Sequence, residues 1–186
     1  MFKANVAVLA LGLWSASAWA QAQEPGLAQI NVNGRSVPAV TLAVIQLPAV
    51  SMDEAALTIA PVLQRHTQDT GHEACAMLCK SSKGWAALPL SVGAHTSCPI
   101  VRQCPNSSTS SGVSIHSHRR AGPYRANLAD MRMLGVSHAV GIYAKADRPE
   151  RFSEEDFQSP GYMVTPNGEV WFQAGPSNVR RVTPNP

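Results

Sequence analysis

The chain has 186 residues, and its 15 Lys and Arg against 12 Asp and Glu give a formal net charge of +3. That charge is too small and too scattered to favour a nucleic-acid-binding protein, and an aromatic content of 6% is too low for base-stacking surfaces. A hydrophobic fraction of 45% excludes wholesale disorder and suffices for one domain with a core. The 14 Pro and 13 Gly favour a loop-rich, strand-containing domain over a helical bundle.

Residues 1–20 have the three parts of a secretory signal peptide. Lys3 gives a basic start, Val6–Trp14 is apolar, and Ala18-Trp19-Ala20 is a small-x-small cleavage site. The apolar stretch is too short to span a bilayer, so a retained membrane anchor is the weaker alternative. We therefore expect cleavage after Ala20 and a periplasmic or secreted protein without a membrane anchor.

The next segment, residues 21–50, is expected to be an N-terminal leader with one or two short strands. Ala28–Val32 is one candidate, and the apolar, β-branched run Val37–Val50 is the other. Ser51 then suits the N-cap of a helix that ends near residues 67–71, because acidic residues follow it in the first turn. Pro61 predicts a kink or a break inside that helix.

Further elements are predicted from alternating apolar residues and turn-forming residues. The expected strands are Glu73–Lys80, Trp85–Val92, Ser97–Arg102, Val113–His118, His138–Ala144, Tyr162–Thr165 and Val170–Gln173. The turn Pro166-Asn167-Gly168 predicts a hairpin between the last two. We also expect a solvent-facing loop over Pro105–Gly112, a helix over Pro123–Leu134, a helical turn over Ser153–Gln158 and a flexible tail over residues 176–186.

Four cysteines follow the signal peptide: Cys75, Cys79, Cys98 and Cys104. An even number in an exported chain predicts two disulfides. If Cys75 and Cys79 lie on one strand, they are roughly 13 Å apart, whereas a disulfide needs Cα atoms within about 7 Å. Each is therefore expected to pair with Cys98 or Cys104, with the partner left open. A zinc site made of all four thiolates is the alternative, which the spacings fit poorly.

Two histidines share one face of a predicted strand. Side chains alternate along a strand, so His116 and His118 face one side while Val113 and Ile115 face the other. Imidazoles placed in this way can reach a common metal ion. Two exposed strand histidines without a metal are the alternative.

The sequence Ser153-Glu154-Glu155-Asp156 permits two interpretations. As a structural feature, Ser-x-x-Asp resembles a capping box at the start of a helical turn. As a functional feature, Asp156 could be a third zinc ligand, which leaves a fourth position for water. Ser153 could then support that water or a developing oxyanion.

Glu73 opens an otherwise apolar strand. A carboxylate there is costly to bury unless it has a function or a partner, and an exposed strand-end carboxylate is the alternative. The pair His72-Glu73 does not begin a His-Glu-x-x-His zinc motif, because Ala76 stands where the second His is needed.

Taken in order, these motifs resemble the JAMM metallopeptidases of the MPN-domain superfamily, in particular the exported bacterial branch. Glu73–Leu78 is similar to the family's Glu-bearing strand, Ser114–His118 to its His-x-His strand, and Ser153–Asp156 to its Ser-x-x-Asp motif. The resemblance covers roughly Met52–Gln173. It implies an α+β fold, with a single MPN/JAB-like domain over residues 51–175 and a mixed, curved β-sheet flanked by helices.

The resemblance also implies a function and a set of site residues. Zinc would be bound by His116, His118 and Asp156, with Glu73 as the general base and Ser153 as the stabiliser of the oxyanion. The protein would then be a zinc-dependent hydrolase that cleaves a peptide or isopeptide bond. Its substrate would be a peptide or a protein, with peptidoglycan stem peptides among the options for an exported enzyme.

The chain departs from the family at two places. Residues 119–152 replace a short spacer between the His-x-His and Ser-x-x-Asp motifs, so Asn127–Asp130 is a rival source of the third ligand. We favour Asp156, with Arg119–Glu150 as an insertion over the site. Arg119-Arg120 replaces a proline and is expected to be either a solvated turn or a contact for a substrate carboxylate. A non-catalytic MPN-like binding module and a secreted effector, each with structural zinc or none, are the alternative functions.

Overall fold

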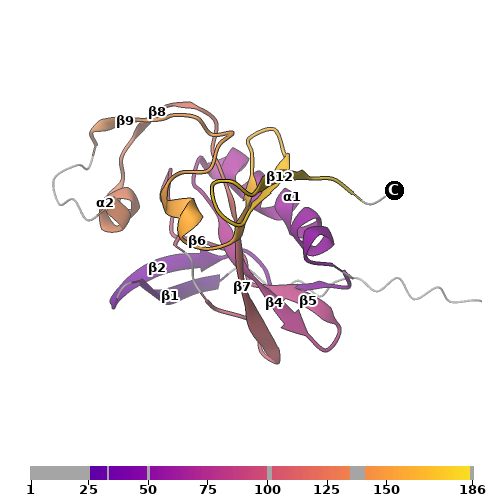
Figure 1. Cartoon of the computed structure of the whole chain (residues 1–186). Helices are drawn as coiled ribbons and strands as arrows, with labels where there is room; N and C mark the ends of the chain where they lie inside the picture. The colour runs from indigo at the N-terminus through magenta and orange to yellow at the C-terminus, as the bar shows by residue number, and fades with distance from the viewer. Residues whose placement is uncertain (1–25, 33, 50, 100–101, 135–140, 185–186) are drawn as a thin grey trace, which may run out of the picture.

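The computed structural model describes residues 26–32, 34–49, 51–99, 102–134 and 141–184 (Figure 1). The expected signal peptide lies outside the described residues. The strands are β1 (Gly26–Val32), β2 (Arg35–Thr41), β3 (Ile45–Leu47), β4 (Cys75–Ser81), β5 (Gly84–Ala87), β6 (Leu90–Ser91), β7 (Ser108–Ser117), β8 (Gly122–Arg125), β9 (Tyr143–Ala146), β10 (Gly161–Val164), β11 (Val170–Gln173) and β12 (Val179–Val182). The helices are α1 (Met52–Thr70), α2 (Leu128–Leu134) and the 3-10 helix η1 (Glu155–Gln158). The fold is therefore α+β, rich in strands and with few helices.

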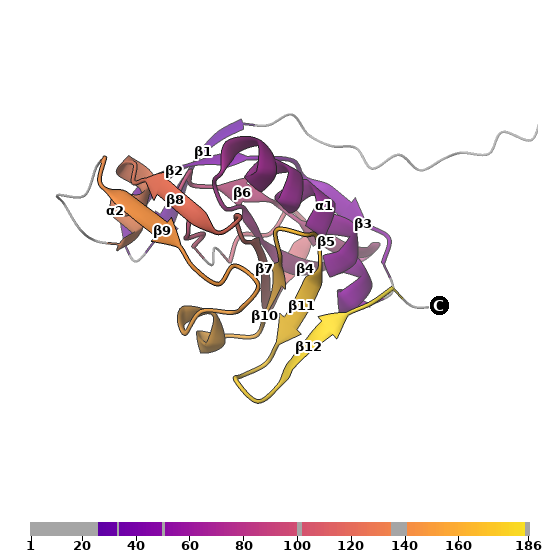
Figure 2. The same ribbon diagram turned by 90° about the horizontal axis from the view of Figure 1, so that it is seen from above.

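A 10-stranded mixed sheet forms the body of the molecule. Its main path runs β1-β2-β6-β4-β7-β10-β11-β12, and β5 and β3 branch from β4. All its neighbouring strands are antiparallel except β7 and β10, which are parallel. Figures 1 and 2 show α1 on one side of β7, and β8, β9 and α2 on the other. Within the described residues, no helix is long and apolar enough to cross a membrane.

Helix α1 begins and ends as the sequence predicts. The Ser51 side chain accepts a hydrogen bond from the Glu54 N–H at 3.1 Å. At the other end, Gly71 adopts a left-handed conformation with φ of 76° and donates its N–H to the Thr67 carbonyl. Pro61 does not break the helix, which runs without interruption through its exposed position. The buried face of α1 packs on the sheet and forms the main core.

The predicted hairpin around Gly168 is confirmed, and the expected strands on either side of residues 81–84 also form a hairpin, with some changes in strand length. Strand β4 turns into β5 through Ser81 and Gly84, and β10 turns into β11 through Val164 and Val170. The expected strand Trp85–Val92 is divided into β5 and β6, which pair with different ends of β4. The expected strand Val37–Val50 is likewise divided: β2 pairs with β1, whereas β3 pairs with β5.

Three expectations about irregular segments need correction. The predicted loop Pro105–Gly112 instead supplies the first half of β7, which pairs with β4 from Ser108 onward. The predicted helix Pro123–Leu134 is shorter at its start, because residues 122–125 form β8 and pair with β9. The expected tail over residues 176–186 contains β12, which pairs with β11.

Other strand predictions fall partly outside the described residues. The described part of Ser97–Arg102 forms no strand, and β9 begins at Tyr143, later than the expected His138. Residues 138–140 are not among the described residues.

Two disulfides join β4 to the segment that follows β6. Cys75 bonds to Cys98 and Cys79 bonds to Cys104, and no free cysteine remains in the described residues. The expected linkage is confirmed, and the pairing that the sequence left open is resolved. Because all four sulfurs are in disulfides, the four-thiolate zinc site is excluded.

Candidate metal centre

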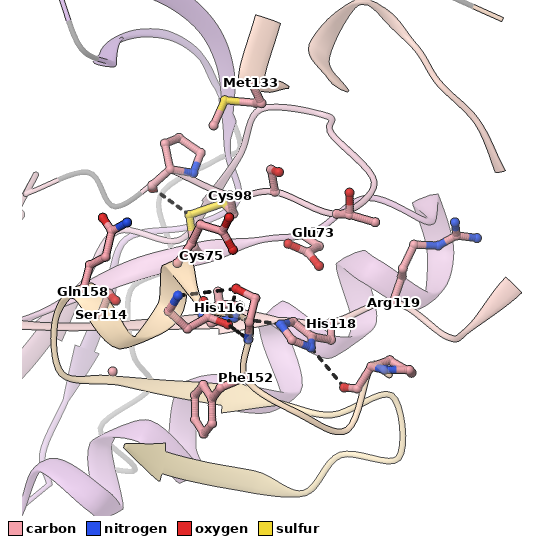
Figure 3. A pocket seen from close by; sticks show the side chains of 18 of the residues that line it. Glu73, Cys75, Cys98, Ser114, His116, His118, Arg119, Met133, Phe152 and Gln158 are labelled. Atoms are coloured by element: carbon pink, nitrogen blue, oxygen red, sulfur yellow. Dashed lines mark hydrogen bonds and ion pairs between the residues drawn. A yellow bond between two sulfur atoms is a disulfide. The ribbon is translucent and has the colours of Figure 1, made fainter. Parts of the chain in front are cut away.

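Side chains of β7 point alternately toward the core and toward the candidate site. Ile115 is fully buried in the core beneath α1, and the Ser117 hydroxyl lies 2.6 Å from the Thr67 hydroxyl of that helix. His116 points from the opposite face into a cavity of about 1080 Å³ (Figure 3). The predicted division of side chains between the two faces is therefore confirmed.

His116, His118 and Asp156 converge in that cavity. One ligand atom from each residue lies within 4.8 Å of the other two. The Nε2 atoms of the two histidines are 2.9 Å apart, and Asp156 Oδ1 lies 3.4 Å from His116 Nε2. Ligands bound at 2.0–2.1 Å in a tetrahedron are about 3.3 Å apart, so the spacing suits one small metal ion.

The outer nitrogen of His118 fixes the orientation of its ring. Nδ1 lies 3.0 Å from the Pro149 carbonyl oxygen, so Nδ1 must be the protonated donor. Nε2 of His118 is then left with a lone pair that faces His116. Metal-binding histidines are commonly held in this way, by a hydrogen bond from the ring nitrogen that does not bind the metal.

Both histidines are kept uncharged by their surroundings. Burial lowers the pKa of His116, and burial together with the neighbouring His116 lowers the pKa of His118 to about 4. Both imidazoles are therefore neutral near pH 7. A metal ion binds only the neutral form, so binding there would not have to displace a proton.

Asp156 is fixed by its own helical turn. Its Oδ2 accepts hydrogen bonds from the Ser153 N–H at 2.7 Å and from the Ser153 hydroxyl at 3.0 Å, and the Asp156 N–H points back to that hydroxyl at 3.4 Å. The predicted capping arrangement is therefore present. It occupies Oδ2 and leaves Oδ1 directed at His116.

A buried glutamine on β11 holds this turn against the sheet. The side-chain amide of Gln173, which is 1% exposed, donates to the carbonyls of Asp156 and Ser159, both at 2.6 Å. Sequence reasoning missed Gln173. Its one signal was a polar residue at the end of a strand in the predicted hairpin.

Glu73 lies beside the group formed by His116, His118 and Asp156, just before β4 begins. Its backbone N–H donates to the Ala94 carbonyl, and its own carbonyl accepts from the Ser91 hydroxyl. The residue is only 6% exposed, so the interpretation as an exposed strand-end charge is wrong. Figure 3 shows its carboxyl group in the same cavity as His116 and His118.

Burial changes the acidity of Glu73. It raises the pKa of the carboxyl group well above its usual range, and the negative charge of Asp156 raises it further. Among the described residues, its carboxyl group has no hydrogen-bond or ion-pair partner. A buried, unpaired carboxyl group in a polar cavity is a typical proton-transfer group.

The insertion covers the site, as expected. Lys145, Arg148 and Pro149 line the cavity together with residues of the sheet. Arg119 lies partly buried against Tyr124, with its guanidinium 4.9 Å from the ring centre, whereas Arg120 is exposed. A solvated turn therefore describes Arg120 but not Arg119.

The rival ligand source Asn127–Asp130 lies elsewhere and has a structural role. Asp130 is 2% exposed and accepts hydrogen bonds from the His95 N–H at 2.7 Å and from the Asn127 N–H at 2.8 Å. The Asn127 side chain caps α2 by accepting from the N–H groups of Ala129 and Asp130. Neither residue belongs to the group formed by His116, His118 and Asp156. No protein-family model, curated protein or solved structure matches the chain.

Proposed function

We propose that the protein is an exported zinc-dependent hydrolase of the JAMM type, which cleaves a peptide or isopeptide bond. The observation that supports it best is the convergence of His116, His118 and Asp156 within 4.8 Å, with Glu73 buried in the same cavity. The proposal includes an MPN/JAB-like fold. It is supported by a mixed sheet with α1 on one face and the histidine strand presenting its ligands from the other.

The donor set fits zinc. Two neutral imidazole nitrogens and one carboxylate oxygen are typical ligands of a catalytic zinc ion, which keeps a further position open. When bound, zinc would polarise the substrate carbonyl and lower the pKa of water toward about 7. His118 and Asp156 would keep their orientation through Pro149 and Ser153, which contact the atoms not used for the metal.

The protein groups would then move the proton. Glu73 would remove a proton from the attacking water and deliver it to the leaving amine, since a raised pKa improves its ability to hold a proton between the two steps. Ser153 would orient Asp156 through the hydroxyl hydrogen bond. Stabilisation of the oxyanion by Ser153 remains part of the proposal, because Ser153 also lines the cavity.

The proposed location outside the cytoplasm is supported by the two disulfides, which are typical of oxidising compartments. A protein in that location would act on a peptide or protein of the cell envelope, including a peptidoglycan stem peptide. The cavity of about 1080 Å³ has room for several residues of such a substrate.

Metal analysis together with a hydrolysis assay tests this function. We expect dialysed wild-type protein to hold one zinc ion per chain and His118→Ala to hold none. Glu73→Gln should keep the zinc while hydrolysis falls by about 10²-fold or more. Asp130→Asn is the matched control and should keep its zinc. Wild-type protein that binds zinc but cleaves no peptide, isopeptide or stem-peptide substrate would contradict the enzyme and favour the non-catalytic module.

A further inference from the structure

Arg119 is held in a fixed place by a stack of rings. Its guanidinium lies 4.9 Å from the centre of the Tyr124 ring, and Tyr124 stacks on the His95 ring at 4.6 Å. His95 is in turn anchored through Nδ1, which lies 2.8 Å from a carboxylate oxygen of buried Asp130. The Tyr124 hydroxyl also contacts Thr96 at 3.2 Å. Tyr124 and Asp130 of the insertion, together with His95 from the segment after β6, therefore support one arginine at the wall of the cavity.

The described residues supply no counter-ion to this guanidinium. Nη1 of Arg119 is buried and has no hydrogen-bond partner among them. Within the described residues, no carboxylate forms an ion pair with Arg119, although its charge lowers the pKa of nearby Glu73. An arginine cannot lose its proton to escape this cost, so an unpaired guanidinium in a polar cavity favours a bound anion.

Arg119 lines the cavity in which the proposed cleavage would take place. Arg119 follows His118 directly in the chain, and it lines the same cavity as Glu73. Figure 3 shows Glu73 between the Cys75–Cys98 disulfide and Arg119. A carboxylate bound at Arg119 would therefore lie in the cavity that Glu73, His116, His118 and Asp156 also line. Guanidinium and carboxylate form a planar, bidentate ion pair that is stronger than a neutral hydrogen bond.

We propose that Arg119 binds the terminal carboxylate of the substrate, so that the enzyme removes the C-terminal residue of a peptide. This inference rests on the proposed hydrolase function and names its substrate class. In the reaction, the water oxygen bonds to the carbonyl carbon and the C–N bond breaks. The amine nitrogen takes the proton that Glu73 removed from the water. The products are a shortened peptide with a new carboxylate and a free amino acid.

Binding to the metal-free protein tests the carboxylate site without turnover. The probes are two acetylated peptides, an all-L trialanine and a lysyl-D-alanyl-D-alanine, each as the free acid and as the C-terminal amide. We expect at least one acid to bind about 10- to 100-fold more tightly than its amide in an NMR titration, as for a hydrogen bond to a charged group. Arg119→Gln should abolish that difference, and Arg120→Gln, the exposed neighbour, should keep it.

Hydrolysis by the zinc-loaded protein tests the role of Arg119 during turnover. We expect wild-type kcat/KM to favour the acid, and Arg119→Gln to reduce kcat/KM for the acid alone. Arg119→Lys, which keeps the charge but not the planar fork, provides a second variant if Arg119→Gln unfolds. Acid and amide treated alike by the wild type, in both binding and cleavage, would overturn the inference. So would equal losses on both probes in folded variants, since Arg119 would then act only on Glu73.

The same measurements distinguish failure of the hydrolase proposal from failure of the carboxylate site. If acids bind in an Arg119-dependent way but no probe is cleaved, the carboxylate site stands and the hydrolase proposal fails. If acid and amide are bound equally and cleaved equally, the hydrolase stands and the carboxylate site fails. If no probe is bound or cleaved, the inference is overturned.

Discussion

Asp156 Oδ1 lies 3.4 Å from His116 Nε2, although the whole insertion separates the two residues in the sequence. The contact exists because β7 and β10 pair directly, which places the turn before β10 next to the histidine strand. The other carboxylate oxygen is held by Ser153. Oδ2 of Asp156 is therefore bound by Ser153, while Oδ1 faces His116.

Removal of the Ser153 hydroxyl should weaken metal binding. In Ser153→Ala, Oδ2 of Asp156 loses the 3.0 Å hydrogen bond from the side chain but keeps the one from the backbone. We expect zinc affinity to fall by about 10- to 100-fold, the usual effect of losing a residue that orients a ligand. Competition with a chromophoric chelator measures it. Unchanged affinity with a lower kcat would instead favour the oxyanion role for Ser153.

Neutralising Glu73 should stabilise the metal-free fold. Burial raises the pKa of the Glu73 carboxyl group. At a pH where this group is charged in the unfolded chain, its burial therefore lowers the free energy of unfolding. Glu73→Gln should therefore raise the free energy of unfolding at pH 8 by about 1 kcal/mol or more. Urea denaturation with chelator present measures it, and Glu154→Gln, at an exposed position of the same cavity, serves as the control. A destabilised Glu73→Gln would show that the carboxylate has a stabilising partner.

The metal-free protein should lose stability as the pH falls from about 6.5 toward 4. The pKa of His118 is lowered to about 4 in the fold, and burial lowers that of His116 as well. In this window the unfolded chain binds protons that the folded chain does not, so acid favours unfolding. His118 contributes a slope of about 1.4 kcal/mol per pH unit within this window.

Glu73 acts in the opposite direction over part of that range, because its raised pKa makes the folded chain bind the extra proton. Urea denaturation from pH 7 to 4 should therefore be done in the Glu73→Gln background. His118→Asn should reduce the slope there by about one proton. A slope that does not respond to His118→Asn would assign the effect to other buried histidines.

The disulfide at the centre of the sheet should contribute strongly to stability. Cys79 is fully buried in β4, and its bond to Cys104 closes a loop with a sequence separation of 25. Cys79→Ala combined with Cys104→Ala should lower the free energy of unfolding by about 3 kcal/mol. Guanidinium denaturation measures the loss. Peptide mapping without reductant should recover Cys75–Cys98 and Cys79–Cys104, and a Cys75–Cys79 peptide would contradict the described pairing.

Elements with strong local signals could be predicted from the sequence. The cap at Ser51 and the turn at Gly168 are determined by residues next to them, so α1 and the β10–β11 hairpin have the expected places. The alternation of β7 likewise gave the correct faces for His116 and Ile115. In the candidate site, His116, His118 and Asp156 lie together, as the sequence indicated for three candidate ligands.

Elements that depend on distant partners could not be predicted. Ser108–Ser111 is polar and looks like a loop, but it becomes a strand because β4 offers a partner. Strand β12 depends in the same way on β11. The supports of the site, Gln173 and the Arg119–Tyr124–His95 stack, are contacts between distant segments, so no local pattern indicates them.

The parallel pairing of β7 with β10 has a consequence for how such a protein could diversify. Two parallel neighbouring strands must be joined by a long crossover. The pairing sets a minimum length for this crossover but no maximum. Here the crossover includes β8, α2 and β9 and supplies Arg119, Lys145 and Arg148 to the cavity wall. The histidines and Asp156 lie at its two ends. Exchange of residues 119–148 alone would therefore give a chimera with a different cavity wall and the same three candidate metal ligands, His116, His118 and Asp156.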